Sequence, residues 1–407
     1  MRKPKEDRDH VTQIASYYGF KTINVPSIKK EDAPHVKSLS KQNLIERESL
    51  SKAPNTLFKL EEKLALLRVY GKKTLETLEA LETHQPTMLI TRKAPKKNII
   101  EFSLDIIGTT KSIAEAILIK TTQAILEEEG YNNISIVLNT IGDREAIHRF
   151  ERELWNYYKK KLNELKGPCK DCVRRNPITH VCEDEKCIAI RRDAPQPMAF
   201  LSEGARTHFR EVLEFIETME IPYQIDPTLF GHRDCFAHTL FEIHLTDAQK
   251  NSQLCGFGFR YSPLSRKLGF KKDIPAISLS CSYQRLKNSV KLKKPKSAQF
   301  YFIHLGFEAK LKSLKIIESL RKWGIPILHA LAGDQITGQI SSAEHMDLPF
   351  IIIMGQKEAM ENNVVVRNTE TRVQETVPLK ELPHYLITIH KSVRMLSLVI
   401  APLILLW

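Results

Sequence analysis

The central stretch of the chain reads LFGHRDCFAHTLFE, from Leu229 to Glu242. Its second half alternates apolar and polar residues through Ile243 and His244, which favours a half-buried β-strand. Ionisable side chains are concentrated in the same stretch, and they are His232, Arg233, Asp234, His238 and Glu242. A strand that carries so many ionisable groups is a candidate for the centre of a functional site.

Two further segments follow this stretch along the chain. They read GFRYSPL, from Gly258 to Leu264, and PAISLSCSYQRL, from Pro275 to Leu286. Together the three segments resemble the histidyl-tRNA synthetase family. Its signature is LVRGLDYYTGTVFE, then GGRYD, then a glycine-rich strand that ends in ERL. The resemblance extends over roughly residues 8–388.

Motifs on either side of these segments strengthen the resemblance. YGFKTINVP, which ends at Pro26, resembles the first class II synthetase motif, and LNTIGD, which ends at Asp143, resembles the family's NSLGD. SLRKWGIPI, IIIMGQKE and VVVRNTETRVQETV resemble the anticodon-binding domain that histidyl, prolyl, threonyl and glycyl synthetases share. From residue 298 onward, apolar runs alternate with helical patterns, which predicts a buried and largely parallel sheet.

These features predict an α+β protein with two main domains. The resemblance implies a class II synthetase core over residues 1–286, an antiparallel sheet flanked by helices, with a cysteine-bearing insertion at about 167–190. A Lys-rich linker at 287–297 marks a domain boundary. An α/β domain of the anticodon-binding type follows at 298–388, and an apolar tail at 389–407. The resemblance also implies a homodimer.

The resemblance assigns candidate site residues as well. Arg285 matches the arginine of the family's third motif. Arg233 lies two residues beyond the position of the arginine in LVRGLD and can point to the same face of a strand, so both arginines are candidate catalytic residues. Retained remnants of the substrate site are Arg68, Asp234, Thr239, Glu242, Arg260 and Tyr261. Asp234 and Glu242 also fit a purely structural role as satisfied polar groups on a sheet.

Other positions depart from the family where its chemistry takes place. The arginine of the second motif is absent, and Arg92 is a candidate for a displaced replacement. Family residues that contact substrates are replaced at Val69, Tyr70, Cys235, Phe236, Ser278, Ser282 and Gln284. Losing one donor to the transition state costs roughly 10²–10³ in rate. The combined losses therefore predict amino-acid activation close to background.

Three functional hypotheses are compatible with this pattern. The favoured one is a catalytically degenerate paralogue, a pseudoenzyme, that binds tRNA or another RNA or acts in regulation. The second is a divergent but active histidine–tRNA ligase that uses ATP and Mg²⁺ with Arg233, Arg285 and Arg92. The third is a regulatory subunit of a metabolic enzyme, although the relatives of that kind usually lack the anticodon-binding domain. Salt-dependent tRNA binding separates the first two from the third.

The composition favours a polyanionic partner. The net charge is +13, from 61 Lys and Arg residues against 48 Asp and Glu residues. Such an excess favours nucleic acid first, and a solvated basic surface is the alternative.

Four of the seven cysteines are clustered, which indicates a metal or thiol site in a reducing compartment such as the cytoplasm. They are Cys169, Cys172, Cys182 and Cys187. Two pairs of thiolates fit a tetrahedral structural zinc site, and free thiols under a loop are the alternative.

The two ends of the chain differ in character. The first ten residues lack the apolar core of a signal peptide. The last thirteen, Met395–Trp407, are almost entirely apolar, which is short of the ~20 residues that span a bilayer. No transmembrane helix is therefore expected, and the tail forms either a buried last element or a contact with a membrane surface.

Overall fold

The computed structural model describes residues 9–32, 34–35, 60–71, 86–93, 98–175, 177, 184–231, 234–246, 251–286, 298–331, 339–340, 343 and 345–389. The chain divides into two compact units. The core unit comprises Lys21–Leu81 and Pro86–Val290, and the C-terminal unit comprises Met1–Phe20, Glu82–Gln85 and Lys291–Trp407. The first twenty residues thus group with the C-terminal unit, whereas the sequence placed them in the core.

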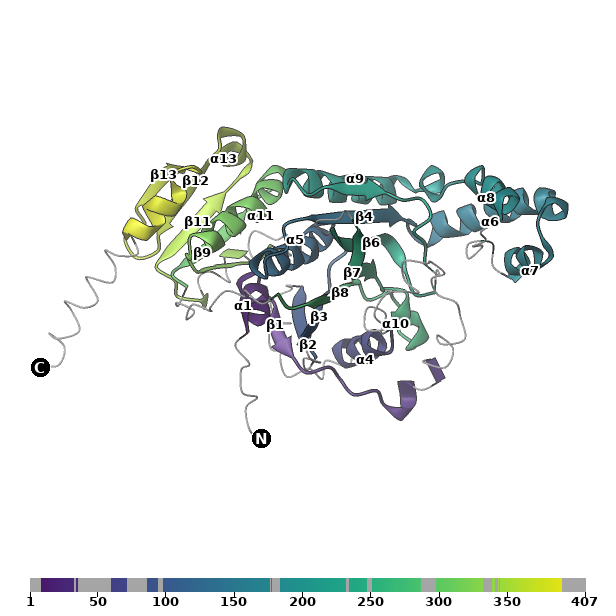
Figure 1. The fold of residues 1–407 in the computed structure, drawn as a ribbon. Helices are drawn as coiled ribbons and strands as arrows, with labels where there is room; N and C mark the ends of the chain where they lie inside the picture. The colour runs from purple at the N-terminus through teal and green to yellow at the C-terminus, as the bar shows by residue number, and fades with distance from the viewer. Residues whose placement is uncertain are drawn as a thin grey trace, which may run out of the picture. The chain divides into compact units, whose positions relative to one another are not determined.

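An eight-stranded sheet forms the centre of the core unit (Figure 1). Its strands, in spatial order, are β1 (Lys21–Ile23), β2 (Thr87–Arg92), β3 (Ile99–Ile107), β8 (Ala276–Gln284), β7 (Ser252–Arg260), β6 (Ala237–Thr246), β4 (Ile134–Thr140) and β5 (Tyr223–Ile225). In this spatial order, each strand from β2 through β3, β8, β7 and β6 to β4 pairs antiparallel with its neighbour. The edge strand β1 pairs parallel with β2, and the edge strand β5 pairs parallel with β4. The predicted antiparallel core is therefore confirmed, and the second half of the central stretch, from Ala237, lies in β6.

Helices cover both faces of this sheet (Figure 1). One face packs against α5 (Ile113–Glu128) and α9 (Glu203–Thr218). The other face lies toward α4 (Leu60–Gly71) and α10 (Leu264–Lys267), whose leucines share one apolar cluster with Phe257 and Phe259 of β7. Gly258, between these two phenylalanines, faces the opposite way. A Cβ atom there would come within 2.1 Å of the Phe241 ring, so only glycine fits.

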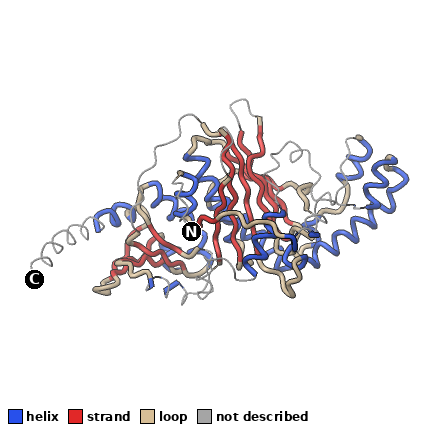
Figure 2. The backbone as a smooth tube through the Cα atoms, turned by 90° about the horizontal axis from the view of Figure 1, so that it is seen from below, coloured by secondary structure: helices blue, strands red, loops and turns tan. Residues whose placement is uncertain are grey.

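A helical arm extends from the core unit, as both views show (Figures 1 and 2). It consists of α6 (Arg144–Lys161), a short 3-10 turn (Leu162–Glu164), α7 (Gly167–Arg175) and α8 (Glu185–Arg192). Asp143 caps α6 by accepting a hydrogen bond from the Ala146 amide at 2.9 Å. Phe150, Leu154 and Tyr158 bury the inner side of α6 against the other helices of the arm.

The C-terminal unit has a mixed five-stranded sheet in the order β10-β9-β11-β12-β13. Its elements are α1 (His10–Tyr17), β9 (Phe300–His304), α11 (Phe307–Lys322), β10 (Ile327–His329), β11 (Phe350–Met354), α13 (Gln356–Glu361), β12 (Asn363–Asn368), β13 (Gln374–Pro378) and a helix at 382–389. β10, β9 and β11 are parallel, while β12 and β13 are antiparallel edge strands. The predicted α/β domain with added edge strands is confirmed.

Some expectations fall outside the described residues. They include the linker at 287–297 and all of the tail except residue 389. Within the described part of the chain, no helix combines the length and apolar character needed to cross a bilayer.

Candidate functional site

The three segments that carry the resemblance lie side by side as β6, β7 and β8, with β3 beside β8. Leu240 of β6 lies opposite Phe259 of β7, which lies opposite Ser278 of β8. Ser278 in turn lies opposite Asp105 of β3. Because partners in register share a face of the sheet, these four side chains all point toward α4.

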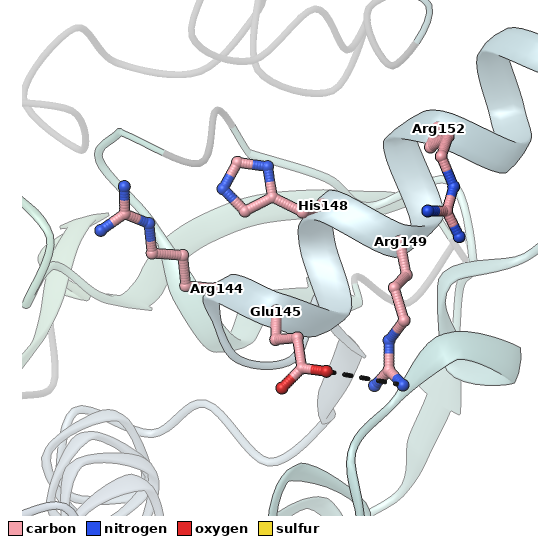
Figure 3. Close-up of a pocket in the computed structure, with 5 residues that line it drawn as sticks. All are labelled: Arg144, Glu145, His148, Arg149 and Arg152. Carbon is pink, nitrogen blue, oxygen red and sulfur yellow. Dashed lines mark ion pairs between the residues drawn. The ribbon is translucent and has the colours of Figure 1, made fainter.

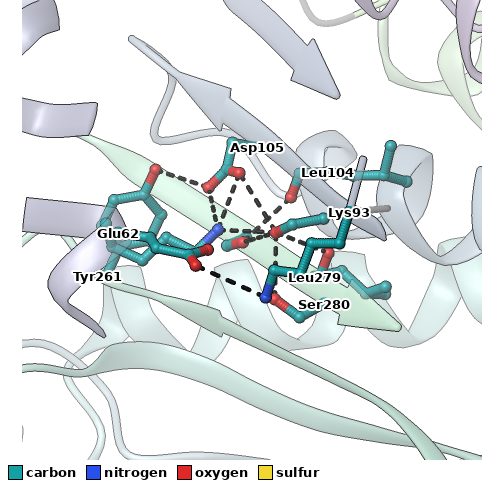
Figure 4. Close-up of polar contacts among 10 residues, drawn as sticks. Glu62, Lys93, Leu104, Asp105, Tyr261, Leu279 and Ser280 are labelled. Carbon is teal, nitrogen blue, oxygen red and sulfur yellow. Dashed lines mark hydrogen bonds and ion pairs between the residues drawn. The ribbon is translucent and has the colours of Figure 1, made fainter. Parts of the chain in front are cut away.

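A buried polar network occupies this face (Figure 4). The Lys63 ammonium of α4 donates to both carboxylate oxygens of Asp105 at 2.9 Å and to the Ser103 hydroxyl at 2.7 Å. The Tyr261 hydroxyl donates to the same carboxylate at 2.9 Å. Lys63 is 3% exposed, Asp105 1% and Tyr261 0%, so water does not screen their interaction.

Serine side chains from β3 and β8 complete the network. The Ser103 hydroxyl oxygen lies 3.2 Å from that of Ser278 and 3.1 Å from that of Ser280. The Ser278 hydroxyl also donates to the Leu104 carbonyl at 3.2 Å. The resemblance to the synthetase family implies a glycine at position 278. The serine therefore fills space that a glycine would leave open beside the backbone.

The charges on this face balance one another. Burial, and then the Asp105 carboxylate, raise the pKa of Tyr261 well above its ordinary value, so the phenol stays protonated and acts as a donor. At the rim, the Lys93 ammonium lies 3.6 Å from the Glu62 carboxylate. Two ammonium groups thus face two carboxylates, which leaves no net charge on these four side chains to attract an anion.

Arg260 points to the opposite face of the sheet. Its guanidinium donates to both oxygens of Glu115 on α5, at 2.7 and 2.6 Å, and to the carbonyls of Thr109 and Lys111. Burial by itself would raise the pKa of Glu115, but Arg260 and then His208 outweigh it and lower that pKa to about 2. The retained arginine is therefore part of an internal ion pair between β7 and α5.

Two other remnants lie within β6 and are fully buried. The Glu242 carboxylate lies 2.8 Å from Nε2 of His244, two residues along the same strand. Thr239 lies opposite Thr140 of β4, and its hydroxyl has no hydrogen-bond partner among the described residues. Glu242 is thus held by a local pair, whereas Thr239 has an unused hydroxyl.

Arg68 and Asp234 also have partners within the protein. The Arg68 guanidinium on α4 lies 2.9 Å from the Asp32 carboxylate and donates to the Ser27 carbonyl at 3.0 Å. The Asp234 carboxylate lies 3.2 Å from the Lys267 ammonium of α10. These side chains bind neighbouring segments of the chain rather than converging on one point.

The candidate catalytic arginines are not brought together among the described residues. Arg285 follows the end of β8 with an exposed side chain, and its amide donates to the Asn98 carbonyl. Arg233 lies outside the described residues. Arg92, at the end of β2, donates to the Glu101 carbonyl at 3.2 Å.

Two positions at which the resemblance implies substrate contacts are apolar in this chain. Cys235 and Phe236 are fully buried in the cluster that contains Leu240 and Phe259. Burial raises the pKa of the Cys235 thiol to about 12, so it stays neutral. Neither side chain supplies the strong hydrogen bond that selection of an imidazole needs.

Cys169, Cys172 and Cys187 of the clustered cysteines lie on the helical arm. Cys169 of α7 and Cys187 of α8 are buried in one apolar cluster with Val173 and Ile190. Cys182 and the side chain of Cys172 lie outside the described residues. Among the side chains that are described, no three His, Cys, Asp or Glu residues meet as metal ligands.

The sequence did not point to Lys63 or Glu115, which form the buried ion pairs with Asp105 and Arg260. Both belong to helices and lie 42 and 145 residues from the residues they bind. Glu115 had a usable signal, since it falls on the buried side of the α5 pattern beside Ile113 and Ala116. Lys63 had none, because an ammonium next to leucines normally extends to solvent.

Comparisons with known proteins agree with this architecture. The family model described as the anticodon binding domain matches residues 299–389, which form the C-terminal sheet and its helices. A histidine–tRNA ligase of Lysinibacillus sphaericus is 26% identical over 298 residues, 71% of this chain and 70% of the relative. That of Acholeplasma laidlawii is 29% identical over 300 residues, 72% of this chain and 71% of the relative.

Solved structures give the same result for the fold. The crystal structure of apo histidyl-tRNA synthetase from S. aureus aligns with 95% of this chain and 99% of its own, with a TM-score of 0.50 and 19% identity. The described fold is that of a class II synthetase core with a C-terminal anticodon-binding domain.

Proposed function

Because the chain is a divergent member of the histidyl-tRNA synthetase family, we propose that it binds tRNA or another RNA and no longer activates histidine. In this proposal the C-terminal domain and the basic surface hold the RNA, and the core serves as a scaffold. The chain acts as a homodimer, as its resemblance to the family implies.

One observation carries the proposal. The face of β3 and β8 that looks toward α4 is filled by the chain's own Lys63, Asp105 and Tyr261, with serines beneath them. A ligand on this face would have to displace a buried, hydrogen-bonded ion pair, and breaking such a pair costs roughly 3–5 kcal/mol. Binding of ATP on this face would therefore be weakened by the free energy needed to break this pair.

The placement of cations supports the same conclusion. Activation of an amino acid depends on positive groups that neutralise the phosphates of ATP in the transition state. Among the candidate arginines that are described, Arg260 is bound to Glu115 and Arg68 to Asp32. Arg92 donates to the Glu101 carbonyl, and Arg285 lies exposed beyond β8. Phosphate stabilisation would rest mainly on Arg285 and on Arg233, which the structure does not describe.

The RNA-binding part of the proposal has separate support. The anticodon binding domain family matches residues 299–389, and the chain carries a net charge of +13. Contacts between Lys or Arg and phosphates release counterions, so binding of this kind weakens steeply as salt rises.

Histidine-dependent exchange between ATP and pyrophosphate tests the loss of activation. We expect exchange by the full-length protein to equal that of the Arg285→Ala variant and of a reaction without protein. Arg266→Ala is the matched control, because Arg266 is a half-exposed arginine paired with Asp273 on the same unit. Exchange that requires histidine and collapses in Arg285→Ala, but not in Arg266→Ala, would instead identify an active ligase.

RNA binding is tested by fluorescence anisotropy with unfractionated tRNA between 50 and 200 mM salt. We expect the logarithm of the binding constant to fall linearly with the logarithm of the salt concentration, as phosphate contacts require. A protein that neither binds tRNA in this way nor exchanges pyrophosphate would favour the regulatory-subunit hypothesis.

A further inference from the structure

Lys63 of α4 has an ammonium group that is enclosed by the protein. The residue is 3% exposed, and its three N–H donors meet three acceptor oxygens. These are both oxygens of the Asp105 carboxylate, at 2.9 Å, and the Ser103 hydroxyl, at 2.7 Å. Leu60 and Leu67 lie on the same side of the helix as Lys63 and belong to the apolar cluster of this face. The aliphatic part of the lysine is therefore buried together with its charge.

The acceptor oxygens are held in place by groups other than the lysine. The Tyr261 hydroxyl donates to the Asp105 carboxylate at 2.9 Å (Figure 4). The Ser103 hydroxyl lies 3.2 Å from that of Ser278 and 3.1 Å from that of Ser280. All of these residues belong to β3, to β8 or to the position directly after β7, and the pairing of these strands fixes their side chains. The sheet thus presents a formed site of oxygen atoms, and α4 supplies the ammonium that fills it.

Burial distinguishes this site from the ion pairs at the surface. In the open hollow on α6, the Arg149 guanidinium lies 3.9 Å from the Glu145 carboxylate, and their side chains are 41% and 77% exposed (Figure 3). Water and salt screen such a pair and compete for its groups. Lys63 and Asp105 are 3% and 1% exposed, so the fixed oxygens of the protein decide which cation fits there.

The chemistry of the site selects a class of cation. A carboxylate and a hydroxyl that converge on one point suit a positive group with three N–H donors, which is a primary ammonium. A quaternary ammonium has no N–H donor and would leave the oxygens unsatisfied. A guanidinium is planar and presents its donors as a rigid fork. Because the space is that of one lysine side chain, the ligand has a short and unbranched chain.

We propose that Lys63 is an internal ligand, which occupies and closes a preformed binding site for a primary alkylammonium ion on β3 and β8. This inference rests on the proposed function, in which the core no longer takes a substrate, and it identifies the contact that closes the core. A tethered ligand has a high effective concentration, so free amines do not displace Lys63 from the wild-type protein. Without the lysine, Asp105 is a buried carboxylate that lacks its cation, and an added ammonium ion restores the pair.

The test uses Lys63→Ala in the full-length protein, with the ethylammonium ion as the probe. This ion is one methylene shorter than the group that the substitution removes, because a van der Waals contact needs more room than a covalent bond. Thermal unfolding of the core unit is followed by circular dichroism in ethylammonium chloride and in sodium chloride of the same ionic strength. Ethanol tests the shape without the charge, and tetramethylammonium chloride tests the charge without N–H donors.

We expect about 50 mM ethylammonium to raise the Tm of Lys63→Ala by about 2–5 °C relative to sodium chloride. Ethanol and tetramethylammonium should not raise it, and the wild-type protein should not respond. If Lys63→Ala does not fold in buffer, recovery of the folded spectrum in ethylammonium takes the place of the Tm as the readout.

Two further variants show whether the response comes from this site. Lys63→Ala/Asp105→Asn lacks the carboxylate but keeps an acceptor for Tyr261, so it should fold and lose the response. Lys312→Ala is the matched control, because the Lys312 ammonium donates to uncharged oxygens, those of the Ala359 carbonyl and the Asn362 side chain. Its loss should create no response to ethylammonium.

The outcomes separate this inference from the proposed function. A Lys63→Ala protein that ethylammonium neither stabilises nor refolds beyond the effect of sodium chloride overturns the inference and leaves the proposed function standing. A response that is equal in the wild-type protein, or that survives in the double variant, does the same. Histidine-dependent pyrophosphate exchange by the wild-type protein overturns both, because the face would then admit a substrate with Lys63 present.

Discussion

At the scale of single residues, the partner of a side chain decides its role more than its agreement with a family motif does. Arg260 and Tyr261 both match the family, yet Arg260 binds Glu115 on one face and Tyr261 binds Asp105 on the other. The sequence predicts both residues as remnants of a substrate site. It could not identify their partners, because those contacts join segments about 150 residues apart and leave no local pattern.

The Arg260–Glu115 pair is expected to stabilise the core unit through its burial. Replacing Arg260 with methionine leaves a fully buried carboxylate without its main partner, so we expect the free energy of unfolding to fall by about 3–5 kcal/mol. Urea unfolding followed by circular dichroism measures the change. Adding Glu115→Leu to this variant should recover part of the loss, because the unpaired charge is then removed.

Arg266→Met serves as the control for this prediction. Arg266 also forms an ion pair, with Asp273, but both side chains are about half exposed, at 49% and 45%. Such pairs contribute less than about 1 kcal/mol. Equal losses in the two variants would show that Arg260 is not a structural residue.

A second residue-scale prediction concerns acid stability of the C-terminal unit. Burial, and then the Lys310 ammonium, lower the pKa of His304 to about 3. The unfolded side chain has a pKa of ~6.5, so below that pH the unfolded chain binds a proton that the folded unit does not. The free energy of unfolding therefore decreases as the pH falls from about 6.5 toward 3, by about 1.4 kcal/mol between pH 7.5 and 5.5 for this group.

Hydrogen exchange of β9 and β11 at pH 7.5 and 5.5, corrected for intrinsic rates, measures this decrease. In His304→Gln the decrease should be smaller, since glutamine does not titrate. Some pH dependence remains from His329 in the same unit, whose pKa burial lowers to about 4. An identical decrease in the variant would exclude His304 as its source.

At the scale of elements, helices with strong periodicity can be predicted from the sequence, and α4 is harder to predict. In α5, Ile113, Ala116 and Ile117 repeat at helical spacing, which is a pattern typical of a buried helix. The α4 segment LEEKLALLRVYG contains Arg68, Val69 and Tyr70, for which the resemblance gave only positions in a substrate site. Its burial depends on Lys63 meeting Asp105 on a distant strand, which neither propensity nor pattern encodes.

The arm formed by α6, α7 and α8 is the element for which metal binding is predicted. Cys169 and Cys187 are buried in one cluster, on two different helices. Cys172 lies three residues after Cys169 on α7, a spacing that places two residues on the same side of a helix, where both can bind one metal ion. We expect about one zinc per chain in the purified protein by elemental analysis. Cys169→Ser and Cys187→Ser should each lose it, because a structural site needs all four ligands.

Cys255→Ala is the matched control for the zinc prediction. Cys255 is equally buried but lies on β7, away from the arm, so its replacement should leave the zinc content unchanged. Wild-type protein without zinc, or a metal that survives in Cys169→Ser, would contradict the prediction.

At the scale of the whole molecule, the resemblance predicted the order and types of the domains but not where the first helix belongs. Its motif likeness placed α1 with the core. In the structure Tyr18 is fully buried in the C-terminal unit, and its hydroxyl donates to the Glu318 carboxylate at 2.6 Å. Tyr17 also donates to the Ile325 carbonyl at 2.8 Å. A contact across 300 residues has no signature in a single sequence.

This long-range contact makes a prediction about how the chain is stabilised as a whole. Replacing Tyr18 with alanine removes a buried ring and leaves Glu318 without one of its donors, which should cost about 3–5 kcal/mol. The loss should appear as faster hydrogen exchange in α11 and β10, which lie in the same unit, while β6 and β7 of the core unit keep their protection.

Tyr131→Ala is the control for this prediction. It removes a hydrogen bond from an exposed hydroxyl to the Gln284 carbonyl in the core unit, and it should leave hydrogen exchange in α11 unchanged. If Tyr18→Ala instead released the strands of the core unit, α1 would belong with the core, as the motif likeness implied. Faster exchange confined to α11 and β10 would show that the two ends of the chain fold as one unit.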